Sequence, residues 1–216
     1  MQAQDDPSTK ETVAQQPEPQ QISTLYGKED IEFLNRFAMS NFSSTVLMLS
    51  DRPPEETLVP VAVMNHVTMN DLISYIHVYD YEHMDYLRLL KTLHLNAPLD
   101  ISTHVVMGRE PVIEMEVYDD ESIDVALICF KKVPVKFQDI IFQVWRKLKS
   151  NGSILLKGIK HTDTDAFLEI QATFKQRIQI PPPIVVQINL IQQTQDLTMI
   201  KKPCYSLAPP PSTAAS

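Results

Sequence analysis

Glycine is scarce in this chain. Gly27, Gly108, Gly152 and Gly158 are the only glycines among 216 residues, whereas average usage near 7% would give about 15. Loops that hold phosphates or dinucleotides need glycine so that the backbone can approach the ligand. The sequence therefore excludes a P-loop and an ordinary Rossmann dinucleotide fingerprint, and it disfavours a nucleotide-dependent reductase.

Cysteine and long apolar runs are also lacking. Cys129 and Cys204 are the only cysteines, and two cysteines so far apart form neither a disulfide framework nor a zinc cluster. No window approaches the run of about 20 apolar residues that a membrane-spanning helix needs, and the first residues lack the pattern of a secretory signal. We therefore expect a soluble protein of a reducing compartment, cytoplasmic or nuclear, with no membrane partner.

Motifs of metal binding and of hydrolysis are missing as well. The six histidines include no pair at i and i+4, and the histidines and acids between 77 and 85 have no recognised metal spacing. No Gly-x-Ser-x-Gly motif is present, and Cys129 lies in an apolar run, where packing is its expected role. The sequence predicts neither a metal site nor a hydrolase.

The two ends of the chain differ from its middle in composition. Residues 1–24 combine three prolines with many glutamines and almost no large apolar side chains, and residues 204–216 include three consecutive prolines. Such segments bury too little apolar surface to offset the entropy lost on ordering. We expect two disordered tails around one domain at residues 25–203.

Charge is unevenly divided along the sequence. Residues 1–130 hold 7 basic and 22 acidic side chains, whereas residues 131–177 hold 10 basic and 4 acidic ones, so the net charge of -8 conceals a basic segment. Its lysines are either an anion-binding face or ordinary solvated charges. If they bind RNA, the candidate contacts are Lys131, Lys132, Lys136 and Lys160 at the carboxyl ends of two expected strands, with Arg146, Lys147, Lys149 and Lys157 as further members of the same face.

Apolar residues recur with the periods of helices and strands in alternation. The clearest helix is expected at 136–149, where one stripe holds Phe137, Ile140, Ile141, Val144, Trp145 and Leu148. Asn151 and Gly152 are expected to end it. Further helices are expected at 28–42, 83–95 and 164–176, and strands at 45–49, 101–107, 123–130 and 153–159, with 73–79 as a strand or a helix end.

Two regions complete the pattern. Residues 184–192 and 197–201 are predicted to form an antiparallel hairpin around a four-residue polar turn. The stretch 51–72 is the least regular, with a strand expected at 59–64 and a short helix at 65–72. Together the elements predict an α/β fold, a three-layer Rossmann-like sandwich with a mostly parallel sheet and a C-terminal antiparallel hairpin strand.

Several segments in this order resemble a known superfamily. Residues 76–84, Ile-His-Val-Tyr-Asp-Tyr-Glu-His-Met, resemble a second strand ending in an acid, and 119–128 resemble the approach to a fourth strand. Residues 144–157 resemble a helix, a turn and a fifth strand, and 199–203 the end of a last strand. From about residue 74 onward the chain is therefore similar to class I S-adenosylmethionine-dependent methyltransferases.

The resemblance implies particular site residues. The strand that contains Lys157 is most similar to that of the ribose 2′-O-methyltransferase (FtsJ-like) branch, in which a lysine here activates the target hydroxyl; the alternative is a strand-edge lysine facing solvent. Cofactor contacts are implied at Ser50, Asp51, Asp80, Tyr81 and Gly108. An acid at the position of Asp80 can accept hydrogen bonds from both ribose hydroxyls, although a strand-end aspartate also caps the following helix.

The sequence also departs from the superfamily pattern. The loop after the first strand is Ser-Asp-Arg-Pro-Pro at 50–54, without glycine and with two prolines that fix φ and remove backbone donors. The fourth strand ends in Cys129 and Phe130 instead of an acid. Near the last hairpin, Asn189, Gln192 or Gln193 replaces the expected glutamate.

These departures favour one function and leave another open. The first hypothesis is a methyltransferase-like pseudoenzyme that binds no cofactor and serves as a binding or regulatory subunit, with a protein partner in a larger complex. The alternative is an active S-adenosylmethionine-dependent methyltransferase on RNA ribose, with an atypical cofactor loop and Lys157 as its activating group.

Overall fold

The computed structural model describes residues 25–41, 45–67, 73–95, 103–108, 115–158, 164–177 and 190–203. The helices are α1 (Lys28–Asn41), α2 (Pro54–Val67), α3 (His83–Leu95), α5 (Phe137–Lys147) and α6 (Thr164–Arg177), with a 3₁₀ turn η2 (Met115–Val117). The strands are β1 (Thr45–Ser50), β2 (Ile73–Tyr79), β3 (Thr103–Gly108), β4 (Ile123–Cys129), β5 (Leu148–Lys157), β6 (Leu190–Gln192) and β7 (Leu197–Lys201).

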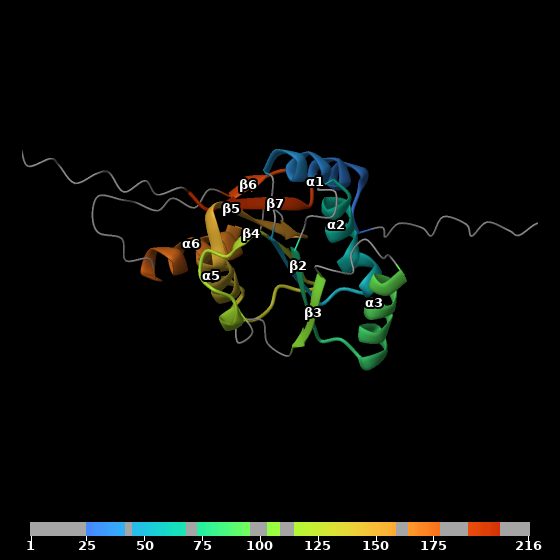
Figure 1. The fold of residues 1–216 in the computed structure, drawn as a ribbon. Coiled ribbons are helices and arrows are strands. Elements are labelled where there is room, and N and C mark those ends of the chain that lie inside the picture. Colours follow the sequence, from blue (N-terminus) through green and yellow to red (C-terminus); the bar gives the residue numbers. More distant parts are fainter. Residues whose placement is uncertain are drawn as a thin grey trace, which may run out of the picture.

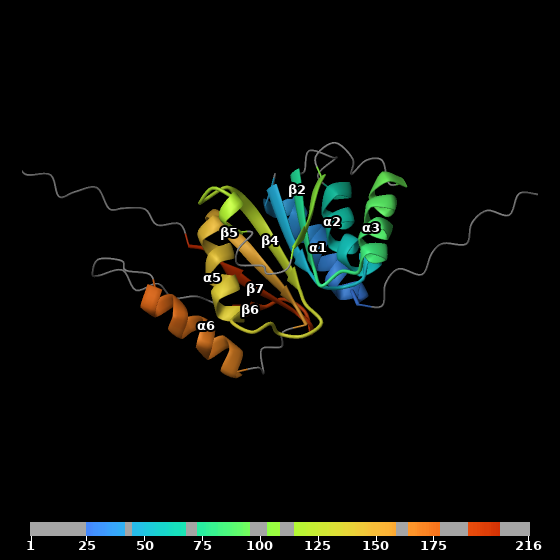
Figure 2. The same ribbon diagram turned by 90° about the horizontal axis from the view of Figure 1, so that it is seen from below.

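The strands form one seven-stranded sheet in the order β3-β2-β1-β4-β5-β7-β6. Strands β1 to β5 pair in parallel, and β7 is antiparallel to both β5 and β6. Helices α1, α2 and α3 cover one face, and α5 and α6 lie on the other (Figures 1 and 2). The predicted three-layer α/β fold with a C-terminal antiparallel hairpin is therefore confirmed.

The predicted amphipathic helix is α5, and its apolar stripe is buried against the sheet. All six stripe residues are buried, and Trp145 also packs on Phe174 of α6, with ring centroids 5.3 Å apart. Phe142 contacts the same ring at 5.4 Å. Figure 2 shows α6 beside α5, and these ring contacts attach the one helix to the other.

The strand expected at 59–64 is wrong, because these residues belong to α2. Pro54 begins this helix, where its missing N–H is not needed, and Glu55 and Glu56 lie in the first turn, where acids favour a helix. The buried side chains follow a helical spacing toward the sheet: Leu58, Val61 and Met64. Packing on the sheet therefore outweighs the β-branched valines and the internal Pro60. Of the expected short helix at 65–72, residues 65–67 belong to α2 and 68–72 lie outside the described residues.

Asn151 and Gly152 do not end the helix as expected. α5 ends at Lys147, and β5 begins at the next residue. The register of β4 with β5 then shifts, because Ile123 pairs with Leu148 while Val125 pairs with Ser153. Asn151 takes a left-handed conformation there (φ 67°), and a Cβ at Gly152 would lie 2.9 Å from two backbone oxygens. This pair therefore shapes an irregularity within β5.

The other expected elements fall as predicted within the described residues. Residues 73–79 form a strand, and the helices at 28–42, 83–95 and 164–176 are confirmed to within a residue or two. Parts of the expected strands, at 101–102, 159 and 184–189, and both expected tails lie outside the described residues. No helix in the described part of the chain is long and apolar enough to cross a membrane.

Candidate functional site

The crevice at the carboxyl ends of β1 and β4 is the expected ligand site of such a sheet, because the connections turn in opposite directions there. The β1–α2 loop at this point is held by its own hydrogen bonds. Ser50 Oγ accepts from the backbone N–H of Arg52 at 3.0 Å and lies 2.8 Å from Thr57 Oγ1. The carbonyl oxygen of Arg52 accepts from Thr57 Oγ1 at 3.0 Å and from the hydroxyl of Tyr81.

Two contacts then join this loop to the end of the neighbouring strand β4. The Arg52 guanidinium donates through Nη2 to the carbonyl oxygen of Phe130 at 3.2 Å. The carboxylate of Asp51 accepts from the backbone N–H of Lys131 at 2.6 Å. Arg52 Nη1 also lies 3.8 Å from Glu56. The side chains of Asp51 and Arg52 therefore bond to backbone atoms just after β4.

The other candidate cofactor contacts lie at the ends of β2 and β3. Asp80 directly follows β2, has a left-handed backbone (φ 55°) that aspartate tolerates, and is exposed. Tyr81 lies 3.1 Å from Thr57 through its hydroxyl, and burial raises the pKa of Tyr81 to about 12. Gly108 ends β3 opposite Tyr79. The structure thus brings Tyr81 onto the β1–α2 loop and leaves Asp80 accessible at the strand tip.

Lys157 ends β5 and points into the protein. Its side chain is only 4% exposed, so the alternative of a lysine facing solvent is wrong. Its Nζ forms an ion pair with Asp30 of α1 and lies 3.9 Å from Asp196 and 5.2 Å from the centroid of the Tyr26 ring. Asp30 also accepts from the Thr194 hydroxyl and, at 3.2 Å, from the backbone of Gly27. The lysine is therefore neutralised by acids of this chain.

The pKa directions around Lys157 describe a cluster with no free base. Burial tends to raise the pKa of Asp30, but hydrogen bonds from Lys157 and Thr194 outweigh it and hold that pKa below its ordinary value. Burial raises the pKa of Tyr26 well above its ordinary value and that of Cys129 to about 11. Tyrosine and thiol are thus neutral at pH 7, and the carboxylate is engaged.

Sequence reasoning missed Asp30, Tyr26 and Arg52. Asp30 is in the first turn of α1, where an acid is explained by the helix dipole, and it lies 127 residues from Lys157 in sequence. Gln192 and Gln193, which were considered as replacements for an acid, lie at the β6–β7 turn, and the acid that approaches Lys157 there is Asp196. Asn189 lies outside the described residues.

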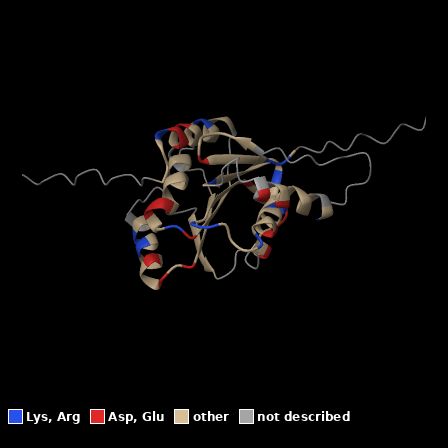
Figure 3. Cartoon of the chain, turned by 180° about the vertical axis from the view of Figure 1, so that it is seen from behind, with Lys and Arg blue, Asp and Glu red and all other residues tan. Residues whose placement is uncertain are grey.

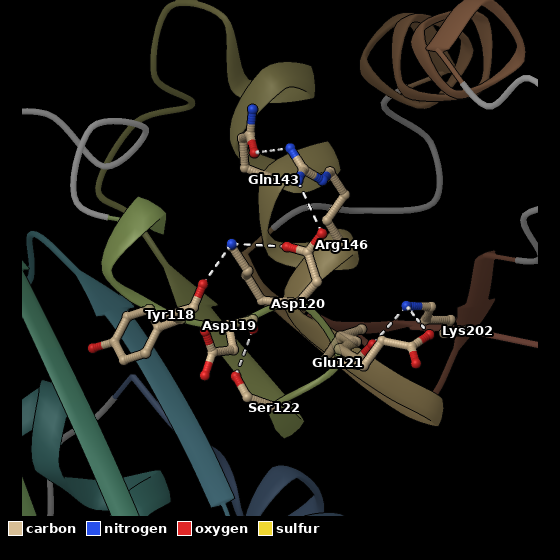
Figure 4. Close-up of polar contacts among 10 residues, drawn as sticks. Tyr118, Asp119, Asp120, Glu121, Ser122, Gln143, Arg146 and Lys202 are labelled. Atoms are coloured by element: carbon tan, nitrogen blue, oxygen red, sulfur yellow. Dashed lines mark hydrogen bonds and ion pairs between the residues drawn. The ribbon is translucent and has the colours of Figure 1, made fainter.

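The basic segment does not form one face. Lys131, Lys132 and Lys136 are exposed near the end of β4, and Lys160 lies outside the described residues. Lys149 pairs with Asp124 at 3.0 Å. Arg146 and Lys147 pair with Asp120 at 2.9 and 2.8 Å, and Figure 4 shows Arg146 beside Asp120. Arg146, Lys147 and Lys149 lie at the amino end of β5, so the expectation that they border the crevice is wrong. Figure 3 shows both charge signs interspersed on the helices.

No protein-family model matches the sequence, and no curated protein matches it. The structure, however, is similar to solved methyltransferases. A protein assigned as a caffeoyl-CoA O-methyltransferase from Staphylococcus aureus aligns with a TM-score of 0.56 at 10% identity, over 82% of this chain and 84% of that one. The Podospora anserina methyltransferase PaMTH1, solved with bound SAH, aligns with a TM-score of 0.53 at 9% identity, over 80% of this chain and 77% of that one.

A third similar structure is an assigned S-adenosyl-L-methionine-dependent methyltransferase from Methanococcus maripaludis, with a TM-score of 0.50 at 14% identity over 86% of this chain and 90% of that one. The chain therefore has the fold of the class I S-adenosylmethionine-dependent methyltransferases, as the resemblance predicted. The likeness to the FtsJ-like branch stays a prediction.

The residues of the crevice fit this cofactor only in part. Asp80 is exposed at the strand tip, where an acid can bind ribose hydroxyls. The β1–α2 loop does not fit, because Pro53 and Pro54 have no N–H and the Arg52 N–H is already bonded to Ser50. The side chains of Arg52 and Asp51 are already bonded to the end of β4.

Proposed function

We propose that this protein is a methyltransferase-like pseudoenzyme that binds no S-adenosylmethionine and serves as a protein-binding or regulatory subunit of a larger complex. The observation that carries the proposal is the pair of contacts from Arg52 and Asp51 to the end of β4. These contacts occupy the side chains of the loop, and Pro53 and Pro54 offer a ligand no backbone donor.

The state of Lys157 supports the same proposal from the substrate side. A lysine that activates a hydroxyl has to reach the substrate, but this one is buried against Asp30 and covered by the ring of Tyr26. Releasing it would leave the buried carboxylate of Asp30 without its cation, which is energetically costly. A catalytic role for Lys157 would thus require α1 to move.

Calorimetry with S-adenosylmethionine tests the proposal without knowledge of any substrate. We expect no measurable heat of binding with the natural protein at cofactor concentrations up to about 1 mM, a range in which a binding free energy near 4 kcal/mol would be detected. The matched variant is Arg52→Gly, which removes the guanidinium bridge and gives the loop a glycine. Micromolar binding by the natural protein, lost on Asp80→Ala, would contradict the proposal.

An active methyltransferase on RNA ribose is the second candidate. It is favoured by the place of Lys157 at the end of β5 and by the exposed acid at Asp80. Transfer of a labelled methyl group from S-adenosylmethionine to RNA, abolished by Lys157→Ala, would establish it and refute the pseudoenzyme. We place the protein in the cytoplasm or nucleus, and RNA is a partner only under this second candidate.

A further inference from the structure

A surface pocket of about 380 Å³ lies between α1 and the strands β5 and β7, on the face of the sheet that carries α1. It is lined by Phe33, Arg36, Phe37, Ser40, Ser153, Gln193, Met199 and Lys201. Figure 1 shows α1 alongside the β6–β7 hairpin, where these residues meet. Ser153 precedes Lys157 by four residues on β5, so the pocket lies toward the amino end of that strand and is separate from the crevice.

Three apolar side chains line one part of the pocket. Phe33 and Phe37 lie one helical turn apart on α1, with ring centroids at 5.7 Å, and the partly buried Met199 faces them from β7. Ile191 pairs with Met199 in the β6–β7 hairpin and is 43% exposed. Directly paired residues of an antiparallel ladder share a face, so Ile191 extends this apolar surface toward the edge of the sheet.

Two basic groups of the pocket have spare bonding capacity, and the Ser153 side chain beside them is only 2% exposed. Arg36 and Lys201 are exposed, and neither forms an ion pair within the described part of the chain; Arg36 donates only through Nε, at 3.4 Å, to the carbonyl oxygen of Glu32. The carboxylate of Glu32 is itself paired with Lys28 at 3.8 Å.

We propose that this pocket binds an acidic segment of a partner protein, with one large apolar side chain of that segment against the apolar lining and flanking carboxylates at Arg36 and Lys201. Its volume lies near the lower end of ligand sites, which run from about 300 to 1,000 Å³, and thus suits one or two side chains better than a whole cofactor. Two unpaired cations beside an apolar lining are complementary to acids beside an apolar anchor. The inference gives the proposed binding subunit its docking site and rests on that proposed function.

The test is a titration of the ¹⁵N-labelled full chain with the acetylated and amidated pentapeptide Asp-Glu-Phe-Asp-Glu, followed by NMR. We expect chemical-shift changes at Phe33, Phe37, Ser153 and Met199. The double variant Arg36→Glu/Lys201→Glu should weaken binding by about tenfold or more, because it replaces attraction with repulsion at the rim. The peptide with alanine in place of phenylalanine should cause no such shifts.

The matched control is Lys131→Glu/Lys132→Glu, which makes the same change of net charge on exposed lysines elsewhere. It should leave the affinity for the peptide within about twofold if the contact is local. Equal weakening by the two double variants, shifts outside the pocket, or no shifts at millimolar peptide would overturn the proposal. A chain lacking residues 1–24 that binds the peptide more tightly would overturn it too, since the acidic tail would then be the occupant.

The peptide test of the docking site and the cofactor test of the proposed function can fail independently of each other. Binding of S-adenosylmethionine in the crevice would refute the pseudoenzyme, yet the peptide shifts would still locate a docking site on α1 and β7. Conversely, absence of both cofactor binding and peptide shifts would refute only the docking site.

Discussion

Lys157 and Asp30 form an ion pair from which water is almost excluded. For such a pair, the net contribution to stability differs greatly from the free-energy cost of removing one partner. Removing water from both charges costs about as much free energy as their attraction returns, so the pair as a whole contributes little to net stability. Removing one partner is different, because the remaining charge stays buried without compensation. The ion pair therefore specifies where the amino end of α1 lies on the sheet.

Lys157→Met tests this asymmetry. We expect the variant to lose about 3 to 5 kcal/mol in the free energy of unfolding, because Asp30 is left buried and unpaired. The double variant Lys157→Met/Asp30→Leu should recover most of the loss, as measured by urea denaturation. The control Lys131→Met, at an exposed lysine, should change stability by less than about 0.5 kcal/mol. Equal losses in the single and double variants would show that the pair is not coupled.

At the scale of elements, α5 organises the half of the core that faces away from α1. Its stripe lies on β4 and β5, and its aromatic residues carry α6. Lys202, just after β7, lies over the ring of Trp145 with Nζ 4.7 Å from the centroid, and burial lowers the pKa of that lysine. Trp145 therefore joins α5, α6 and the last strand.

Trp145→Ala should cost about 3 to 5 kcal/mol of unfolding free energy, because it leaves a large cavity among these three elements. Trp145→Phe keeps a ring for Phe174 and should cost clearly less. Thermal melts of the two variants and the parent measure the difference. A Tm for Trp145→Ala within a degree or two of the parent would mean that the packing of α5 described above is wrong.

The comparison of α5 with α2 shows which elements can be predicted from sequence. The stripe of α5 has helical spacing and no competing strand-like alternation, so local pattern and burial agree. In α2, the alternating valines indicate a strand and Pro60 disfavours a helix interior, whereas Leu58, Val61 and Met64 pack onto the sheet as a helix. The local signal for this helix was its start, where Pro54 is followed by the acids Glu55 and Glu56.

The candidate site likewise contains some residues that the sequence predicts and others that it does not. Lys157 and Asp80 could be found because they lie at the ends of recognisable strands. Arg52 and Asp30 could not, because their roles depend on contacts with residues far away in sequence, at Phe130 and Lys157. A loop without glycine predicts that the cofactor fits poorly, but only the fold identifies the contacts that the loop makes with the end of β4.

For the whole molecule, the uneven charge along the sequence is resolved by pairing between segments. Acids of residues 1–130 meet bases of residues 131–177 at both ends of the sheet, through Asp30 and Lys157 at one end and Asp120 and Lys147 at the other. Hydrogen bonds from Lys147 and Arg146 lower the pKa of Asp120, and the pKa of Asp30 is lowered as well. Folding therefore favours the ionised form of both carboxyls.

This linkage predicts acid sensitivity. A carboxyl whose pKa is lowered in the folded state stabilises the fold above its unfolded pKa, near the ordinary value of 3.8, and that contribution disappears as the pH falls through the lowered folded value. Urea unfolding between about pH 5 and pH 2 should show a steep loss of stability. Asp30→Asn should flatten this dependence, and Asp120→Asn, at a half-exposed site, should flatten it less. An unchanged slope in Asp30→Asn would contradict the linkage.

The hydrogen bond from the backbone N–H of Lys131 to the carboxylate of Asp51 also allows hydrogen exchange to report on the contact between the β1–α2 loop and the end of β4. This amide lies in an exposed loop and would ordinarily exchange its hydrogen with solvent quickly, but here it exchanges only when the carboxylate of Asp51 releases it. We expect it to exchange much more slowly than the amide of Lys132, and Asp51→Ala should abolish the difference in a deuterium-exchange experiment. Its exchange rate in the natural protein then measures how often the contact between the β1–α2 loop and the end of β4 opens.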